Sequence, residues 1–198
     1  TQSRSSAASD VYKRQGVCDA SAWTPTTLVF EPVGGSEYGL PAGHWRQTVS
    51  TGAGSRITYF DAMWQPLLVR EFDGGDVAGT QRFTRFTYDA NGRQTFASYP
   101  STSSSPTTGN WTSYDALGRT TSSSVDSDSG TLTTLTSYLS GHRTQLTDPR
   151  NLQTTTSYQV YDQPAYDSPT LILAPEDSRT VINRDVFGKP LSITRSNG

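Results

Sequence analysis

Hydrophobic and polar residues alternate over short stretches of this chain, a pattern typical of β-strands with two unlike faces. The longest stretch covers residues 152–161, where every second residue is Leu, Thr, Tyr or Val and the intervening positions are mostly Gln, Thr and Ser. Shorter strands are indicated where Phe86 and Tyr88, and also Leu191 and Ile193, share one face. No segment has the spacing of an amphipathic helix. The pattern therefore predicts an all-β fold.

Composition supports strands and turns over disorder. The 198 residues are only 32% hydrophobic, but they are also only 17% charged, with a net charge of −2 and 17 glycines and 11 prolines. A disordered chain this poor in aliphatic residues would carry more charge. The chain has no basic stretch that would favour nucleic acid and no apolar run of about 18 residues that would span a membrane. We expect neither partner.

Candidate catalytic and metal-binding residues are few. Cys18 is the single cysteine, so it permits no internal disulfide and no thiolate cluster. His44 and His142 lie far apart in a Gly/Pro-rich loop and at a turn, and are expected to be solvated turn histidines. The stretch 126–130 resembles the opening of a calcium loop, but Ser137 stands where the bidentate acid is needed. We therefore expect no catalytic residue, no metal, no cofactor and no enzyme.

A six-residue motif recurs along the chain. Two copies align without gaps, Tyr-Asp-Ala-Asn-Gly-Arg at 88–93 and Tyr-Asp-Ala-Leu-Gly-Arg at 114–119. A third copy, at 184–189, keeps the Asp-x-x-Gly-basic core, and a fourth, at 60–65, keeps only Phe-Asp-Ala. Two Tyr-Asp dipeptides, at 161–162 and 166–167, lack the glycine. The spacing is loose, which indicates a repeat with inserted loops.

The chemistry of the motif is that of a hairpin turn. An Asp carboxylate can accept hydrogen bonds from backbone N–H groups two residues on. A glycine three residues after the Asp supplies the left-handed conformation that closes a short hairpin. The Arg that follows can reach the Asp or lie on a neighbouring aromatic ring. The residues expected to build these turns are Tyr88, Asp89, Gly92, Arg93, Tyr114, Asp115, Gly118, Arg119, Asp185, Gly188 and Lys189.

At these residues the chain resembles the Rhs/YD-repeat family, whose hallmark is a Tyr-Asp-x-x-Gly-Arg repeat. The resemblance covers about residues 57–198, including the linking strand that follows Asp148-Pro149-Arg150. It implies a ribbon of β-hairpins that forms part of a spiral β-shell. In bacteria such shells enclose a C-terminal toxin domain, and related animal teneurins act in adhesion. The implied partners are neighbouring repeats and a toxin cargo outside this chain, and the implied location is secreted or on a bacterial surface.

The family's proteolytic step uses an Asp-Pro-x-Gly motif. Here Asp148-Pro149 is followed by Arg150-Asn151, so the glycine is absent and the activity is not carried over.

Three segments are expected along the chain. Residues 1–15 are expected to be a disordered arm of non-native origin, because residues 5–15 resemble the translation of a transposon adaptor used to fragment DNA. Residues 16–56 are expected to be a loop-rich lead-in with a few short strands. Residues 57–198 are expected to be the repeat array, cut at its C-terminal end.

An alternative function stays open: a cell-surface carbohydrate- or cell-binding adhesion module. Its candidate contact residues are the four tryptophans, although most of them are expected to be buried in the sheet. These are Trp23, Trp45, Trp64 and Trp111.

Overall fold

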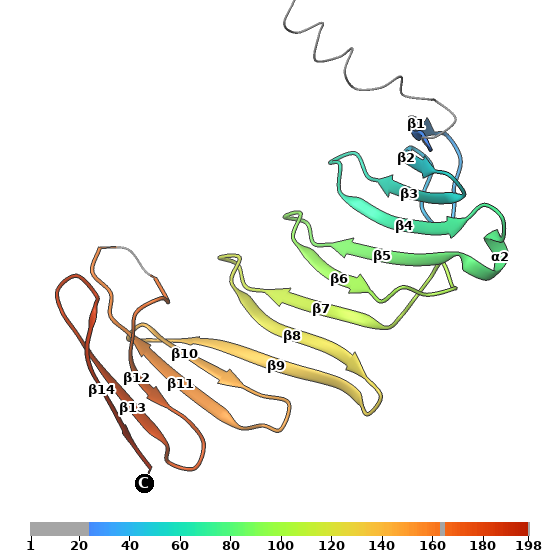
Figure 1. Cartoon of the computed structure of the whole chain (residues 1–198). Coiled ribbons are helices and arrows are strands. Elements are labelled where there is room, and N and C mark those ends of the chain that lie inside the picture. The colour runs from blue at the N-terminus through green and yellow to red at the C-terminus, as the bar shows by residue number, and fades with distance from the viewer. Residues whose placement is uncertain (1–23, 163–164, 198) are drawn as a thin grey trace, which may run out of the picture. The chain divides into compact units, whose positions relative to one another are not determined.

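The structure, a computed structural model, describes residues 24–162 and 165–197. The adaptor-like segment 1–15 lies outside these residues. Fourteen strands form one antiparallel sheet in which each strand pairs with its neighbours in the sequence (Figure 1). Within the described residues, β1 (Thr26–Val33) and β14 (Pro190–Ser196) each pair on one side only, so the sheet is open. The predicted all-β fold is confirmed.

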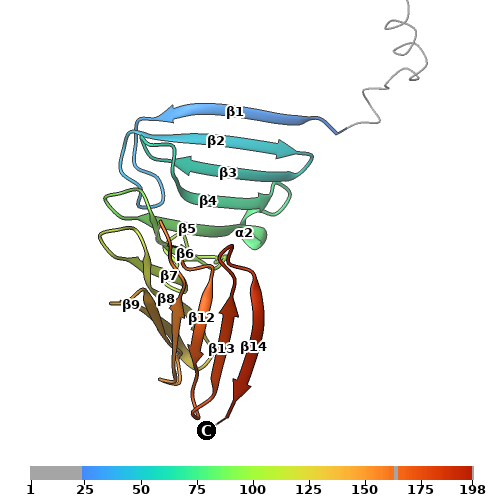
Figure 2. The same cartoon turned by 90° about the vertical axis from the view of Figure 1, so that its left-hand side faces the viewer.

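The chain divides into two compact units, and the described residues of the first are 24–85 and 100–106. Figure 2 shows its strands side by side in chain order, from blue to green. The expected start of the repeat array, residue 57, falls inside a strand, and two eight-residue strands precede that strand. The elements of this unit after β1 are β2 (His44–Thr51), β3 (Gly54–Phe60), β4 (Pro66–Asp73), the short helix α2 (Val77–Thr80) and the first half of β5 (Arg82–Tyr88).

The first unit has a hydrophobic core on one face of its sheet. Tyr59 lies opposite Leu68 in the pairing of β3 with β4, Phe83 on β5 lies opposite Arg70 of β4, and the side chains of Tyr59, Leu68 and Phe83 are almost completely buried. Leu40 joins them from the loop between β1 and β2, residues 34–43, which runs down beside the following strands (Figure 2). Because this loop supplies a core residue, it packs against the buried face of the sheet and does more than connect β1 to β2.

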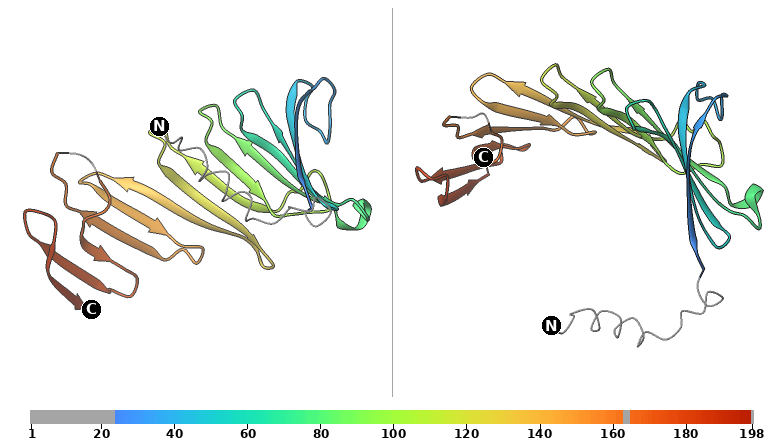
Figure 3. Two further views of the ribbon diagram at one scale, coloured as in Figure 1. Left: turned by 45° about the horizontal axis from the view of Figure 1, so that its top comes forward. Right: turned by 90° about the horizontal axis from the view of Figure 1, so that it is seen from above.

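The described residues of the second unit are 86–99, 107–162 and 165–197. Its strands contact only their neighbours in sequence and can be followed in Figure 3 from green to red. Besides the second half of β5 and β14, they are β6 (Gln94–Ser98), β7 (Gly109–Tyr114), β8 (Thr120–Ser127), β9 (Gly130–Leu139), β10 (Arg143–Thr147), β11 (Gln153–Tyr158), β12 (Pro169–Leu173) and β13 (Arg179–Arg184).

The second unit is organised differently from the first. Among its described residues no large hydrophobic side chain is buried, and Leu191 and Ile193 on β14 are mostly exposed. Hydroxyl pairs bridge adjacent strands instead, such as Thr87 with Thr95 and Ser124 with Thr133, each with oxygens 2.9 Å apart. With so little apolar burial, the strand ladders and the turns must hold this unit together.

Candidate functional site: the aspartate-capped turns

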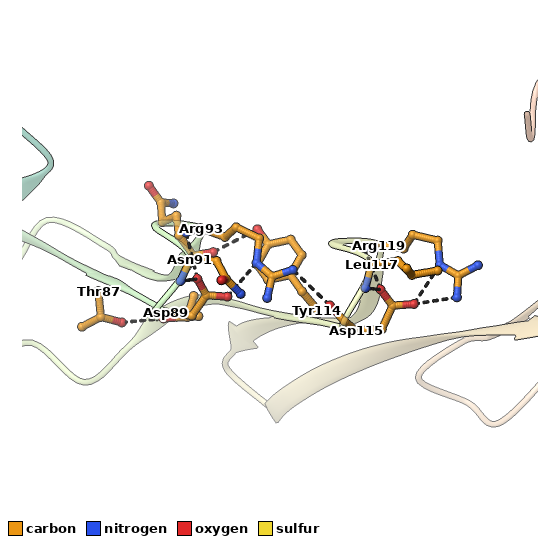
Figure 4. Close-up of polar contacts among 10 residues, drawn as sticks. Thr87, Asp89, Asn91, Arg93, Tyr114, Asp115, Leu117 and Arg119 are labelled. Atoms are coloured by element: carbon orange, nitrogen blue, oxygen red, sulfur yellow. Dashed lines mark hydrogen bonds and ion pairs between the residues drawn. The ribbon is translucent and has the colours of Figure 1, made fainter. Parts of the chain in front are cut away.

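The Asp115 copy of the motif shows how one carboxylate closes a hairpin. The Asp115 backbone N–H donates to the Arg119 carbonyl at 2.9 Å, and the Gly118 N–H donates to the Asp115 carbonyl at 3.0 Å. The side-chain oxygen Oδ1 accepts from the backbone N–H groups of Leu117 and Arg119, both at 2.9 Å (Figure 4). These four hydrogen bonds thus fix the backbone conformation of the five residues 115–119.

The arginine that ends this copy of the motif binds the second oxygen of the Asp115 carboxylate. Arg119 Nε and Nη2 each lie 2.7 Å from Asp115 Oδ2. The Arg119 guanidinium also lies 3.9 Å from the centre of the Tyr138 ring, on the neighbouring strand β9. The backbone N–H of Arg119, then its side chain, hold the pKa of the Asp115 carboxyl below its usual 3.8, although desolvation opposes the shift.

The Asp89 copy has the same geometry and in addition reaches the next copy. Asp89 Oδ1 accepts from the Asn91 and Arg93 N–H groups, and Oδ2 accepts from Arg93 Nε at 2.7 Å. Arg93 Nη1 then donates to the Asp115 carbonyl at 3.0 Å, while its guanidinium lies 4.8 Å from the centre of the Tyr114 ring (Figure 4). One arginine therefore connects two successive turns.

The Asp185 copy keeps the turn but changes the cation. Asp185 Oδ1 accepts from the backbone N–H groups of Phe187 and Lys189. Arg184, one residue before the Asp, donates to the Gly188 carbonyl and to the Pro169 carbonyl on β12. The link to the neighbouring strand is thus made by an arginine at a different position of the motif.

Two further turns have the same hydrogen bonds. In the fourth copy, Asp61 Oδ1 accepts hydrogen bonds from the backbone N–H groups of Met63 and Gln65. Asp148, which the sequence places in a linking segment, accepts from the N–H groups of Arg150 and Leu152 in the same manner. The sequence motif misses this fifth turn because no glycine follows Asp148.

The residue three positions after each Asp has the left-handed backbone conformation. Gly92, Gly118 and Gly188 have φ of 77°, 82° and 80°. Asn151 and Trp64 take the same position with φ of 63° and 64°. Asn tolerates this conformation, and its place three residues after an Asp is the signal that could have identified the fifth turn. A tryptophan there is unusual.

The Tyr-Asp dipeptide at 166–167 has a different role. Tyr166 stacks on His142, with ring centres 4.5 Å apart, and lies edge-on to Tyr138 and Tyr158. Arg119 Nη1 donates to the Tyr166 hydroxyl at 3.3 Å. These rings attach the connection between β11 and β12 to β9 and its turn.

Both histidines differ from the expected solvated turn residues. His44 is 2% exposed, because the loop 34–43 folds over it and its ring packs against Tyr59. His142 does lie at the turn between β9 and β10, but it is half-buried by Tyr166, and its Nε2 lies 2.7 Å from the Ala165 carbonyl. The expectation of solvation is wrong for His44, and His142 is only partly exposed.

Three tryptophans lie within the described residues, and Trp23 and Cys18 lie outside them. Trp64 is 56% exposed and lies 5.3 Å from Phe30 and 5.5 Å from Trp45, measured between ring centres. Trp111 is half-buried and packs against Phe96 at 5.1 Å. The expectation that most are buried in the sheet does not hold for Trp64.

The described residues contain no group of three or more His, Cys, Asp or Glu placed to hold a metal ion. Within the same part of the chain, no helix is long and apolar enough to cross a membrane. The recurring chemistry is that of turn closure and of arginine contacts between adjacent hairpins. No family model matches this chain, and no curated protein matches it.

Proposed function

We propose that the chain is a structural repeat segment of a large secreted or surface-delivered Rhs-type bacterial protein. It forms part of a β-shell that encapsulates or presents a C-terminal toxin domain not contained in these residues. Neighbouring repeats of the same polypeptide are its main partners.

One observation carries this proposal: the same aspartate-capped turn occurs five times in the part of the chain that the structure describes, at Asp61, Asp89, Asp115, Asp148 and Asp185. An acid that closes a turn in every copy is held by its own backbone and is not poised for catalysis. The second unit, whose described residues include no buried large hydrophobic side chain, also suits a wall better than a solid globular domain.

The test is to recover the parent gene from its source DNA and read the sequence on both sides of residues 16–198. Further Tyr-Asp repeats followed by an Asp-Pro-x-Gly segment and an unrelated tail would support the shell. A parent gene in which this repeat stands alone, next to a catalytic or wall-anchoring domain, would overturn it. The same read tests the adaptor interpretation, because residues 5–15 should be absent from the gene.

A second candidate, the carbohydrate- or cell-binding adhesion module, is favoured by a cluster of rings in which Phe30 and Trp64 are exposed and Trp45 is half-buried. Its test is a glycan array probed with the wild-type chain and with Trp64→Gly, which places at this turn the residue used at three of the other four. Binding that depends on Trp64 would support adhesion, and absence of wild-type binding would count against it.

A further inference from the structure

A buried polar cluster lies under the loop 34–43 of the first unit. His44 Nδ1 lies 2.8 Å from the Pro41 carbonyl, and the His44 side chain is 1% exposed. Its other ring nitrogen, Nε2, lies 3.7 Å from Glu37 Oε2. Both of these atoms are buried and neither has a hydrogen-bond partner among the described residues.

The position of one proton follows from the Pro41 carbonyl. A carbonyl oxygen only accepts, so Nδ1 must carry a hydrogen. In a neutral ring Nε2 would then be a bare acceptor, and it would face a carboxylate oxygen that is also an acceptor. Two buried acceptors without a proton between them are unfavourable.

The surrounding charges indicate which group holds the second proton. Arg46 Nη1 donates to Glu37 Oε1 at 2.8 Å, which favours Glu37 as a carboxylate. Arg46 also donates from Nε and Nη2 to Glu31 Oε1. The two carboxylates thus share one guanidinium, and a protonated His44 supplies a second positive charge beside them.

Two tyrosines and one arginine also lie on this face around His44; the arginine, Arg70 on β4, lies over the Tyr38 ring, 5.4 Å from its centre, and donates to Gln81. Tyr59 packs on the ring from β3, and burial raises its pKa to about 12, so it is a neutral phenol near neutral pH. Tyr38, next to Glu37 in the loop, lies edge-on to Tyr59.

We propose that His44 is held as an imidazolium paired with Glu37, and that this pair is a pH-sensitive latch closing the loop 34–43 over the core of the first unit. The loop carries Glu37, Pro41 and the core residue Leu40, and His44 is the first residue of β2. Both ring nitrogens of His44 therefore attach the loop to β2, Nδ1 through the Pro41 carbonyl and Nε2 through Glu37. Loss of the proton leaves the two acceptors facing each other, and the loop opens.

The direction of the pH effect follows from proton linkage. The closed state binds a proton that the open state gives up near neutral pH, so closure is fully favoured at low pH and weakens as pH rises.

The test uses amide hydrogen exchange of the full chain between pH 6 and pH 8. The Leu40 N–H donates to the Glu37 carbonyl and the Gly43 N–H to the Val33 carbonyl, so both amides report loop opening. We expect their exchange to rise with pH beyond the intrinsic base-catalysed increase, while core amides of β3 and β4 do not. Exchange that follows the intrinsic rate alone overturns the latch.

The matched variant is Glu37→Gln. Its carbonyl oxygen can still accept from Arg46, and its amide N–H can donate to a bare Nε2, so a neutral His44 is accommodated. We expect the fold to be kept and the pH dependence of the loop to disappear; persistence of that dependence overturns the proposal. If the variant does not fold, the ¹⁵N chemical shifts of the two His44 ring nitrogens in the wild-type chain test the proposal instead. Shifts of a neutral imidazole at pH 6 would contradict the proposed ion pair with Glu37.

Discussion

At the scale of single residues, the backbone conformation three positions after each Asp decides which side chains the turn accepts. Gly118 has φ of 82°, and a Cβ added there would lie 3.4 Å from Arg93 Nη1, part of the contact between successive turns. We expect Gly118→Ala to lower the free energy of unfolding by about 1–2 kcal/mol, the cost of a left-handed residue with a Cβ. Chemical denaturation measures the loss.

The control for this substitution comes from the chain itself. Asn151 occupies the same position of the Asp148 turn with φ of 63°. Gly118→Asn should therefore be less destabilising than Gly118→Ala, because Asn tolerates this conformation better. Equal losses for the two variants would mean that contact with Arg93, and not backbone strain, sets the cost.

The carboxylates of the turns make the chain sensitive to acid. Backbone N–H groups, and then the arginine side chains, hold the pKa values of Asp89, Asp115 and Asp148 below 3.8. Since the folded pKa is the lower one, this stabilisation is complete above about pH 4 and is lost as pH falls through the folded values. We expect the midpoint of thermal unfolding to fall steeply below pH 4. Asp115→Asn should flatten that slope, and an unchanged slope would contradict the role of Asp115.

At the scale of elements, the turns could be predicted from the sequence more fully than the packing. An Asp, a Gly and an Arg at fixed spacing specify a local structure, so Asp89 and Asp115 could be interpreted without long-range information. The role of Leu40 depends on Tyr59, Leu68 and Phe83, which lie on three later strands. No local pattern indicates such contacts. The sequence alone therefore places His44 in solvent, although the loop that carries Leu40 buries it.

The connection between successive hairpins can be tested through Arg93, which contacts both Asp89 and the Asp115 carbonyl. Arg93→Lys keeps the charge but loses the fork of donors and the planar contact with Tyr114. We expect a loss of about 0.5–1 kcal/mol, the value of a cation–π pair at an exposed site. Amide exchange should also increase at Gly118, in the next turn.

Arg150 provides the control for this element. Among the described residues, its side chain forms hydrogen bonds only within its own turn, where Nε and Nη2 donate to Asp148 Oδ2, and it is 78% exposed. Arg150→Lys should affect exchange only within residues 148–152. A response of Arg93→Lys that stays within residues 89–93 would show that the contact with the next turn contributes nothing.

At the scale of the whole molecule, the two units should differ in local stability. The first has a core of four buried side chains, each contributing about 1.5–3 kcal/mol by burial. The described part of the second has no buried large hydrophobic side chain and relies on ladders, hydroxyl pairs and capped turns. Local opening requires less free energy where fewer apolar contacts must be broken.

We therefore expect amides of β3 and β4 to exchange at least about tenfold more slowly than those of β10 to β13, a difference of about 1.4 kcal/mol in opening free energy. Hydrogen exchange read by mass spectrometry on the full chain measures both regions in one sample. Leu68→Ala should remove most of the difference, since it deletes a side chain with no exposed surface. Leu191→Ala, on the exposed β14, should leave it unchanged. Equal protection of the two regions in the wild type would show that the capped turns stabilise a single-layer sheet as well as a buried core does.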